Sequence, residues 1–528
     1  MLFTSFEFLL FVGVLFAVYY LMPVRARWVV LLLASMAFYA LSGLWGVLFM
    51  GINITATWLL GLKVGSMRQK SAEYFKTHLA SASLKEKKEF KDAAKKKWGR
   101  YVLLCVVIDV ALLVLLKYFN AIAGGIGTLF GATEGLSFVK LAVPMGISFY
   151  TLSAIGYVVD VGNGKCAVER NLAKFALYIS FFPAVVQGPI ARYGELSKTL
   201  YGPHRYDGKT VRAGLLRICW GYFKKVVIAD RLFVAVSALS GDPQGYMGAW
   251  SLLLFVFYTI QIYADFTGGI DITLGIAQIF GVKLAENFDR PFFSRSLAEY
   301  WRRWHISMGS WFRDYVFYPI SASKGMLELT KKCRSKLGDG FGRRIPVYIS
   351  TLVTWLVTGL WHGPTLNFVM WGLLNGIILM LATEIAPACE KLHARHPGLG
   401  KNKAFIVLQC VRTVGITAAL RMLDLNTSVG VTFARLGSIF TGGNYSIFAD
   451  GSIFNLGLGG ADYIIVTIGC VAMLAVSLLA GKKKVSLRLE EKGYGAVYAA
   501  IAVLICLTLI FGAYGIGYDS SQFIYNQF

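Results

Sequence analysis

Long apolar runs separated by short basic segments are the main pattern of this chain. A membrane-crossing helix needs about 20 predominantly apolar residues. The runs lie near residues 3–22, 28–42, 44–62, 101–118, 140–160, 172–191, 211–239, 249–264, 267–282, 345–361, 366–386, 405–422, 461–480 and 495–514. The pattern predicts an all-α polytopic membrane protein.

Two regions depart from simple crossings. The segment 175–192 contains Pro183 and Pro189, and proline removes a backbone donor that lipid cannot replace, so we expect a re-entrant or broken helix. Residues 288–319 are too charged for a lipid-facing helix and too aromatic for a solvent loop. That segment is expected to lie buried in protein or to line a cavity.

Basic residues predict the orientation, since short segments rich in Lys and Arg stay cytoplasmic. Residues 63–100 carry a net charge of +8, 324–344 of +5, 391–403 of +4 and 482–492 of +3. With these segments inside, both termini are predicted outside. Residues 74–98 resemble an amphipathic helix on the inner leaflet, and a solvated charged loop is the alternative.

Composition narrows the class further. The 528 residues are 56% hydrophobic and 16% charged, against about 25% charged in soluble proteins, which excludes a soluble enzyme. The net charge of +24 follows from the segments between apolar runs, so it indicates membrane topology and not nucleic-acid binding. The eight Cys are scattered, which indicates neither a disulfide framework nor a zinc site.

Two of the six His stand outside ordinary polar surroundings. His362 follows the run 345–361, roughly 25 Å along a helix from Arg344 at about 1.5 Å per residue, so we expect it deep in the bilayer. An ionisable group there is a candidate functional residue, although a His bonded within a helix bundle is the alternative. Trp361 and Asn367 are candidate substrate-binding neighbours.

His305 is the second candidate. In a continuous helix it would share a face with Arg302 and Trp301, which are three and four residues away. Arginines of this segment could hold a phosphate or carboxylate, and a structural ion-pair network with Glu299, Asp314 and Asp289 is the alternative. The candidate substrate-binding residues here are Trp301, Arg302, Arg303, Trp304, Arg313 and Asp314.

Two carboxylates, Asp265 and Asp271, lie in apolar surroundings, where either could orient a histidine or an arginine. Asp265 is included among the candidate substrate-binding residues. Motifs of nucleophilic, zinc-protease and Walker sites are not evident in the sequence. The chemistry indicated is general base catalysis between two bound substrates, without a metal or covalent intermediate.

The run Tyr300–Tyr315 (YWRRWHISMGSWFRDY), followed 57 residues after His305 by Trp361-His362-Gly363, resembles the membrane-bound O-acyltransferase (MBOAT) superfamily. The stretches 143–150, 178–190, 265–268 and 286–291 resemble the bacterial branch that contains the alginate O-acetylation protein and the teichoic acid D-alanyl transferase. The length, the C-terminal spans and the ending 522–528 are similar to the alginate-acetylation type.

This resemblance implies a helical bundle with re-entrant or broken helices around a central tunnel. It also implies His362 as the catalytic base, His305 as a second catalytic residue, and Arg302 and Arg303 near the cytoplasmic mouth. The expected organisation is N-terminal spans (1–62), a basic cytoplasmic loop or amphipathic helix (63–100), an MBOAT catalytic core (101–386) and C-terminal spans (387–528).

The function expected from the resemblance is transfer of an acetyl group from a cytoplasmic thioester to an extracytoplasmic polysaccharide. Acetyl-CoA or another acyl thioester, including an acyl carrier, is the expected donor, and no cofactor or metal is expected. An extracytoplasmic SGNH-type acetyltransferase is the expected partner, and the bacterial cytoplasmic membrane the location. Alternatives are transfer of D-alanyl or another acyl group, a proton-coupled transporter and a non-catalytic scaffold.

Overall fold

The computed structural model describes residues 3–129, 143–481 and 485–514, and every named element within them is a helix. Within these described residues, eight helices are long and apolar enough to cross a membrane: α3, α4, α11, α16, α17, α18, α20 and α22. These features confirm the prediction of an all-α polytopic membrane protein. The chain divides into two compact units, residues 1–214 with 273–285, and residues 215–272 with 286–528.

Unit 1 contains α1 (Phe6–Leu21), α2 (Arg27–Ala40), α3 (Leu44–His78), α4 (Leu84–Leu129), α5 (Ile147–Asn163), α6 (Leu172–Ser180), α7 (Phe182–Val185) and α8 (Tyr193–Leu200). The helices α9 (Gly208–Tyr222) and α11 (Ala249–Ile279) contribute residues to both units.

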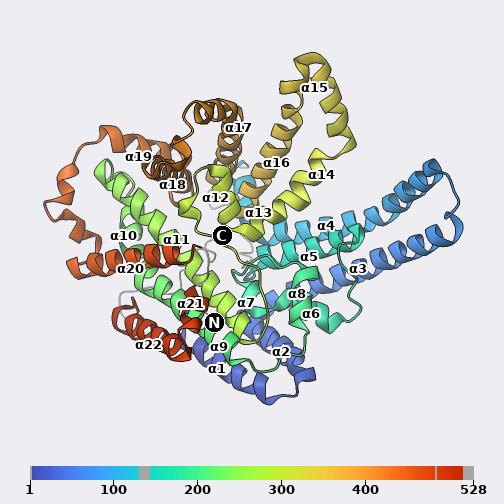
Figure 1. Cartoon of the computed structure of the whole chain (residues 1–528), viewed down its shortest axis with the longest axis horizontal. Helices are drawn as coiled ribbons and strands as arrows, with labels where there is room; N and C mark the ends of the chain where they lie inside the picture. The colour runs from blue at the N-terminus through green and yellow to red at the C-terminus, as the bar shows by residue number, and fades with distance from the viewer. Residues whose placement is uncertain (1–2, 130–142, 482–484, 515–528) are drawn as a thin grey trace. The chain divides into compact units, whose positions relative to one another are not determined.

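A long hairpin of α3 and α4 dominates unit 1 (Figure 1). At about 1.5 Å per residue, its 35 and 46 residues exceed the roughly 30 Å of a bilayer core. Residues 63–100, expected as a loop or a separate amphipathic helix, form the distal part of this hairpin. Tyr74 stacks on His78 and Phe90 there, with ring centroids 4.4 and 5.2 Å apart.

The predicted break in the apolar segment after residue 172 is confirmed. Phe181 has φ −48° and ψ 104°, which ends α6 and places α7 in a new direction. Pro183 then lies in the first turn of α7, where its missing N–H costs no helical hydrogen bond. The backbone therefore changes course inside protein, because Phe181 and Phe182 are both buried.

Unit 2 contains α10 (Asp230–Gly241), α12 (Leu297–Arg303), α13 (Ile306–Phe312), α14 (Tyr318–Ser321), α15 (Lys324–Gly342), α16 (Arg344–His362), α17 (Leu366–Arg395), α18 (Lys403–Leu425), α19 (Val429–Thr441), α20 (Gly460–Leu479), α21 (Val485–Glu491) and α22 (Tyr494–Phe511). Two stretches, η2 (Phe223–Ala229) and η4 (Arg313–Phe317), are π-helical.

The apolar runs 249–264 and 267–282 fall largely within one continuous helix, because α11 has 31 residues. Asp265 and Gly268 interrupt its apolar sequence without interrupting its backbone. Asp265 is fully buried and forms an ion pair with Lys225, which compensates its charge inside the protein. Gly268 lies where the end of α9 approaches, since an added Cβ would come within 2.9 Å of the Gly221 carbonyl oxygen.

Candidate active site

His362 lies at the end of α16, where the chain turns back into α17. The two helices cross closely at Gly359 and Gly372, because a Cβ on either glycine would come within 2.3 Å of a backbone carbonyl on the other helix. The imidazole of His362 lies 4.8 Å from the Trp371 ring, centroid to centroid. The glycines therefore set the helix separation that brings the His362 and Trp371 rings together.

His305 does not lie on a continuous helix, so the expected face shared with Trp301 and Arg302 is not formed. Helix α12 ends at Arg303, Trp304 is extended and pairs with Phe288 in a single antiparallel bridge, and His305 takes φ 49° before α13 begins. Such left-handed backbone is uncommon outside glycine, although histidine is among the residues that adopt it more often. The turn points the imidazole into the protein, where it is 1% exposed.

Asn287 holds the His305 ring. Its Oδ1 accepts hydrogen bonds from the Ser307 backbone N–H at 3.0 Å and the Ser307 hydroxyl at 2.9 Å, and it lies 3.3 Å from His305 Nδ1. The backbone N–H can only donate, so the amide atom facing it is oxygen. His305 Nδ1 must then carry the proton, which leaves Nε2 with the lone pair that a base requires.

Burial keeps this ring neutral. Desolvation, with the Arg421 guanidinium as a second cause, lowers the pKa of His305 to about 3. A neutral ring can accept a proton at neutral pH, whereas an imidazolium cannot. The environment therefore suits His305 to a role as acceptor or hydrogen-bond donor in its uncharged form.

Both histidines line one small enclosed cavity, the histidine cavity, with about 30 Å³ of space. That volume accommodates about one or two water molecules. Its lining residues are Ile262, Phe266, Trp301, Trp304, His305, Met308, His362, Trp371, Arg421 and Asp424. Of the predicted site residues, it brings together His305, His362, Trp301 and Trp304.

Arg421 and Asp424 were missed from the sequence. They lie near the end of α18, and the Arg421 guanidinium stands 4.2 Å from the Trp304 ring centroid and donates to the Tyr300 hydroxyl at 3.2 Å. The signal that could have identified them is an arginine and an aspartate three residues apart where the apolar run 405–422 ends.

A second space, the large cavity, adjoins the first and has a volume of about 900 Å³. Arg302 and Arg313 line it together with Tyr348, Thr351 and other residues of α16 and α17. It shares Trp301 and Met308 with the histidine cavity. The two spaces therefore adjoin at these two residues.

A third space, the polar cavity, lies at the opposite end of the α16–α17 hairpin and has a volume of about 240 Å³. It is lined by Thr365, Asn367, Phe368, Leu423, Asp424, Asn426 and Thr427. Asp424 lines both this space and the histidine cavity. Asn367, a predicted substrate-binding residue, thus lies in the polar cavity and not beside the histidines.

The remaining predicted arginines are held by carboxylates. Arg303 pairs with Glu299 at 2.7 Å, and Arg313 pairs with its neighbour Asp314 at 3.0 Å. These two contacts fit the alternative of a structural ion-pair network, although Arg313 also lines the large cavity. Trp361 is buried, with its ring centroid 6.4 Å from that of His305.

Asp265 and Asp271 pair with lysines and an arginine contributed by α9 and η2, and not with either histidine. Asp265 lies 2.6 Å from Lys225 Nζ, and Lys225 also binds Asp230 at 2.6 Å. Asp271 accepts hydrogen bonds from Lys224 at 2.7 Å and Arg217 at 2.8 Å. All three cations lie within the apolar run 211–239, which has no motif that marks them as partners of these carboxylates.

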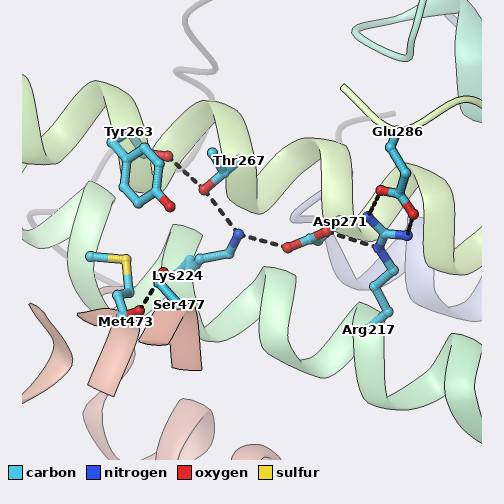
Figure 2. A network of polar contacts seen from close by, with 8 residues as sticks. All are labelled: Arg217, Lys224, Tyr263, Thr267, Asp271, Glu286, Met473 and Ser477. Atoms are coloured by element: carbon cyan, nitrogen blue, oxygen red, sulfur yellow. Dashed lines mark hydrogen bonds and ion pairs between the residues drawn. The ribbon is translucent and has the colours of Figure 1, made fainter. Parts of the chain in front are cut away.

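The Asp271 contacts form part of a longer charged network, shown in Figure 2. Lys224 also donates to Thr267 at 2.9 Å, and Arg217 binds the Glu286 carboxylate with two hydrogen bonds of 3.0 and 2.6 Å. Glu286 directly precedes Asn287 in the chain. The network therefore fixes the backbone beside the residue that holds His305.

In the residues that the structure describes, no cluster of three or more His, Cys, Asp or Glu side chains is placed to hold a metal ion. The candidate chemistry rests on two imidazoles, the Arg421 guanidinium and the Asp424 carboxylate around one enclosed space. Such a set can move a proton and stabilise developing negative charge while largely excluding water.

The sequence comparisons identify the class of this site. A profile of the membrane-bound O-acyltransferase family matches residues 167–330. The probable alginate O-acetylase of Pseudomonas putida is 33% identical over 396 residues, which cover 72% of this chain and 70% of that protein. The chain belongs to the membrane-bound O-acyltransferase family, and it is an O-acyltransferase.

Other relatives differ in the groups they are named for. The probable alginate O-acetylase of Pseudomonas syringae is 32% identical over 73% of this chain and 67% of its own length. The peptidoglycan O-acetyltransferase of Helicobacter pylori is 27% identical over 70% and 66%. The teichoic acid D-alanyltransferase of Bacillus subtilis is 26% identical over 51% and 65%. The family resemblance expected from the motifs is confirmed, which sets aside the transporter and scaffold alternatives.

Proposed function

We propose that this enzyme transfers an acetyl group from a cytoplasmic thioester, acetyl-CoA, for O-acetylation of an extracytoplasmic polysaccharide. The observation that carries the proposal is the succession of three cavities through unit 2. The histidine cavity shares lining residues with the large cavity on one side and with the polar cavity on the other. Two substrates can thus approach the same imidazoles from different directions.

The large cavity suits the thioester donor. An acyl-CoA is an anionic head on a long, narrow arm, and Arg302 and Arg313 supply cationic groups that bind phosphate well. The cavity runs along α16 from Val347 to Thr358, and the basic α15 directly precedes α16. By the positive-inside rule, that end of the helix faces the cytoplasm.

His362 is the general base in the proposed reaction. It takes the proton of the acceptor hydroxyl as the hydroxyl oxygen attacks the thioester carbonyl carbon. The new C–O bond forms, the C–S bond breaks, and the thiolate leaves with the proton carried by the imidazole. Arg421, in the same cavity, stabilises the negative charge that develops on the carbonyl oxygen.

The acetyl group and the polysaccharide acceptor are inferred from the relatives. The alginate O-acetylases match this chain at higher identity and over more of its length than the D-alanyltransferase does. We place the enzyme in the bacterial cytoplasmic membrane with both termini outside, and we infer an extracytoplasmic SGNH-type acetyltransferase as a partner.

Proteoliposomes test this function. Wild-type protein is reconstituted in one known orientation, and radiolabelled acetyl-CoA is supplied to the face that carries α15. We expect acetyl ester to form on a glycan supplied to the other face, and no ester with His362→Ala. Equal rates with donor on either face would contradict the transmembrane direction, and D-alanyl carrier protein as the sole productive donor would contradict the acetyl group.

A further inference from the structure

Asp424 stands between the histidines and the polar cavity, since its side chain lines both spaces. It is 8% exposed and lies at the end of α18. An acceptor that enters through the polar cavity therefore meets this carboxylate on its way to the imidazoles. No motif of the sequence analysis included it.

The Asp424 carboxylate is attracted to Arg421 but is not tightly bonded to it. Their closest atoms, Nη1 and Oδ2, are 3.8 Å apart, which is longer than a hydrogen bond. The guanidinium is also held by the Tyr300 hydroxyl and the Trp304 ring. A carboxylate in this state retains the capacity to accept a hydrogen bond from an incoming hydroxyl.

Apart from Asp424, the wall of the polar cavity consists of neutral side chains, and its amides are held by hydrogen bonds. Asn367 Nδ2 donates to the Asn426 carbonyl at 2.6 Å, Asn426 Nδ2 donates to the Met422 carbonyl at 2.7 Å, and Asn426 Oδ1 accepts from Arg435 at 3.2 Å. Among the lining residues described for this cavity, none has a cationic side chain. Amides, hydroxyls and one phenyl ring suit an uncharged, hydroxyl-bearing ligand.

We propose that the polar cavity binds an uncharged acceptor with at least two hydroxyls and that Asp424 accepts a hydrogen bond from the hydroxyl next to the one that becomes acylated. This inference rests on the proposed function and specifies its acceptor. The neighbouring hydroxyl is held by Asp424, the reacting hydroxyl loses its proton to His362, and its oxygen forms the ester bond as the thiol is released. Asp424 itself exchanges no proton in the net reaction.

The lining of the polar cavity also gives a direction of selectivity. A sugar that bears a carboxylate, such as a uronate, would lose hydration there, and the lining residues described for the cavity include no cation to pair with that charge. Alginate is a polymer of uronates. The acceptor that reaches this site is therefore a neutral sugar or another neutral hydroxyl, in contrast with the polymer for which the relatives are named.

The test uses the purified full-length protein with acetyl-CoA and two acceptor probes, cellotetraose, which is neutral, and a mannuronate tetrasaccharide. For the wild type we expect kcat/KM to be about 10-fold or more higher for cellotetraose. Asp424→Asn should raise the KM for cellotetraose by about 10-fold, since a hydrogen bond to a charged group becomes one to a neutral amide, and should leave the KM for acetyl-CoA unchanged.

Asp450→Asn is the matched control, since Asp450 is exposed and lies outside the three cavities. The inference would be overturned by the wild-type protein alone if it preferred the mannuronate tetrasaccharide to cellotetraose, or if it transferred acetyl groups only to water. An Asp424→Asn effect on acetyl-CoA equal to that on cellotetraose would also overturn it. Failure of the wild type to consume acetyl-CoA under any condition would instead refute the proposed function.

Discussion

Replacement of Asn287 tests how the site prepares His305. Asn287→Ala removes the oxygen that accepts from the Ser307 N–H and hydroxyl and faces His305 Nδ1. Leaving a buried donor without an acceptor costs about 1–3 kcal/mol, and loss of a residue that orients a functional histidine typically lowers activity about 10–100-fold. We expect kcat for acetyl transfer to fall within that range.

Asn287→Asp separates ring orientation from simple structural support. The carboxylate can still accept the three hydrogen bonds, but its negative charge lies about where Oδ1 now stands, 3.3 Å from the ring nitrogen. It therefore raises the pKa of His305 from its value of about 3 towards neutrality. Since the protonated ring cannot act in its neutral role, the variant should lose activity as the pH falls from 8 to 5.

The assay is the initial rate of thiol release from acetyl-CoA between pH 5 and 8, with acceptor present. The wild type should show no acid limb from His305 in this range. Asn402→Ala is the control, since Asn402 is exposed and accepts two backbone N–H groups at the start of α18. Wild-type activity in Asn287→Ala, or the wild-type pH profile in Asn287→Asp, would refute the reasoning.

Three further substitutions have definite expected outcomes. Gly359→Ala should destabilise unit 2 by about 1–3 kcal/mol, because the added Cβ overlaps the α17 backbone. The destabilisation is measured as a lower midpoint of thermal unfolding in detergent. Gly415→Ala, at an open site, should not lower that midpoint. Lys225→Met should lower the free energy of unfolding by about 3–5 kcal/mol, because it leaves two buried carboxylates without their cation. Lys95→Met, at an exposed position, should leave the unfolding midpoint unchanged in the same assay. Arg302→Gln should raise the KM for acetyl-CoA several-fold and change the KM for cellotetraose little. An equal rise in both KM values would contradict the assignment of the large cavity to the donor.

The positions of most long helices could be predicted because lipid imposes a minimum apolar length. The runs at 345–361 and 366–386 correspond to α16 and α17, and His362 was identifiable because an ionisable group at the end of such a run requires an explanation. Helix α15 was expected as a basic loop, and residues 63–100, which form the distal part of the α3–α4 hairpin, were expected as a basic loop or an amphipathic helix. Charge indicated their side of the membrane and gave no information on their helicity.

The site itself required tertiary structure. Asp424 lies 119 residues after His305, and the two line one cavity only because α18 packs on α12 and α17. The left-handed turn at His305 arises from the bridge between Phe288 and Trp304, which no local propensity indicates. Asp265 and Asp271 were recognised as unusual, but their cations were overlooked because Lys224 and Lys225 lie within an apolar run.

The most direct test of the account is acetyl transfer by the purified protein after loss of one imidazole. His362→Ala is compared with His396→Ala, which removes an exposed histidine outside the three cavities, and thiol release from acetyl-CoA is measured together with ester formation on the acceptor. The account predicts that His362→Ala keeps the wild-type unfolding temperature and forms both products at least about 100-fold more slowly. His396→Ala should match the wild type in both rates. Wild-type rates in a folded His362→Ala protein would contradict the central claim that this histidine performs the transfer.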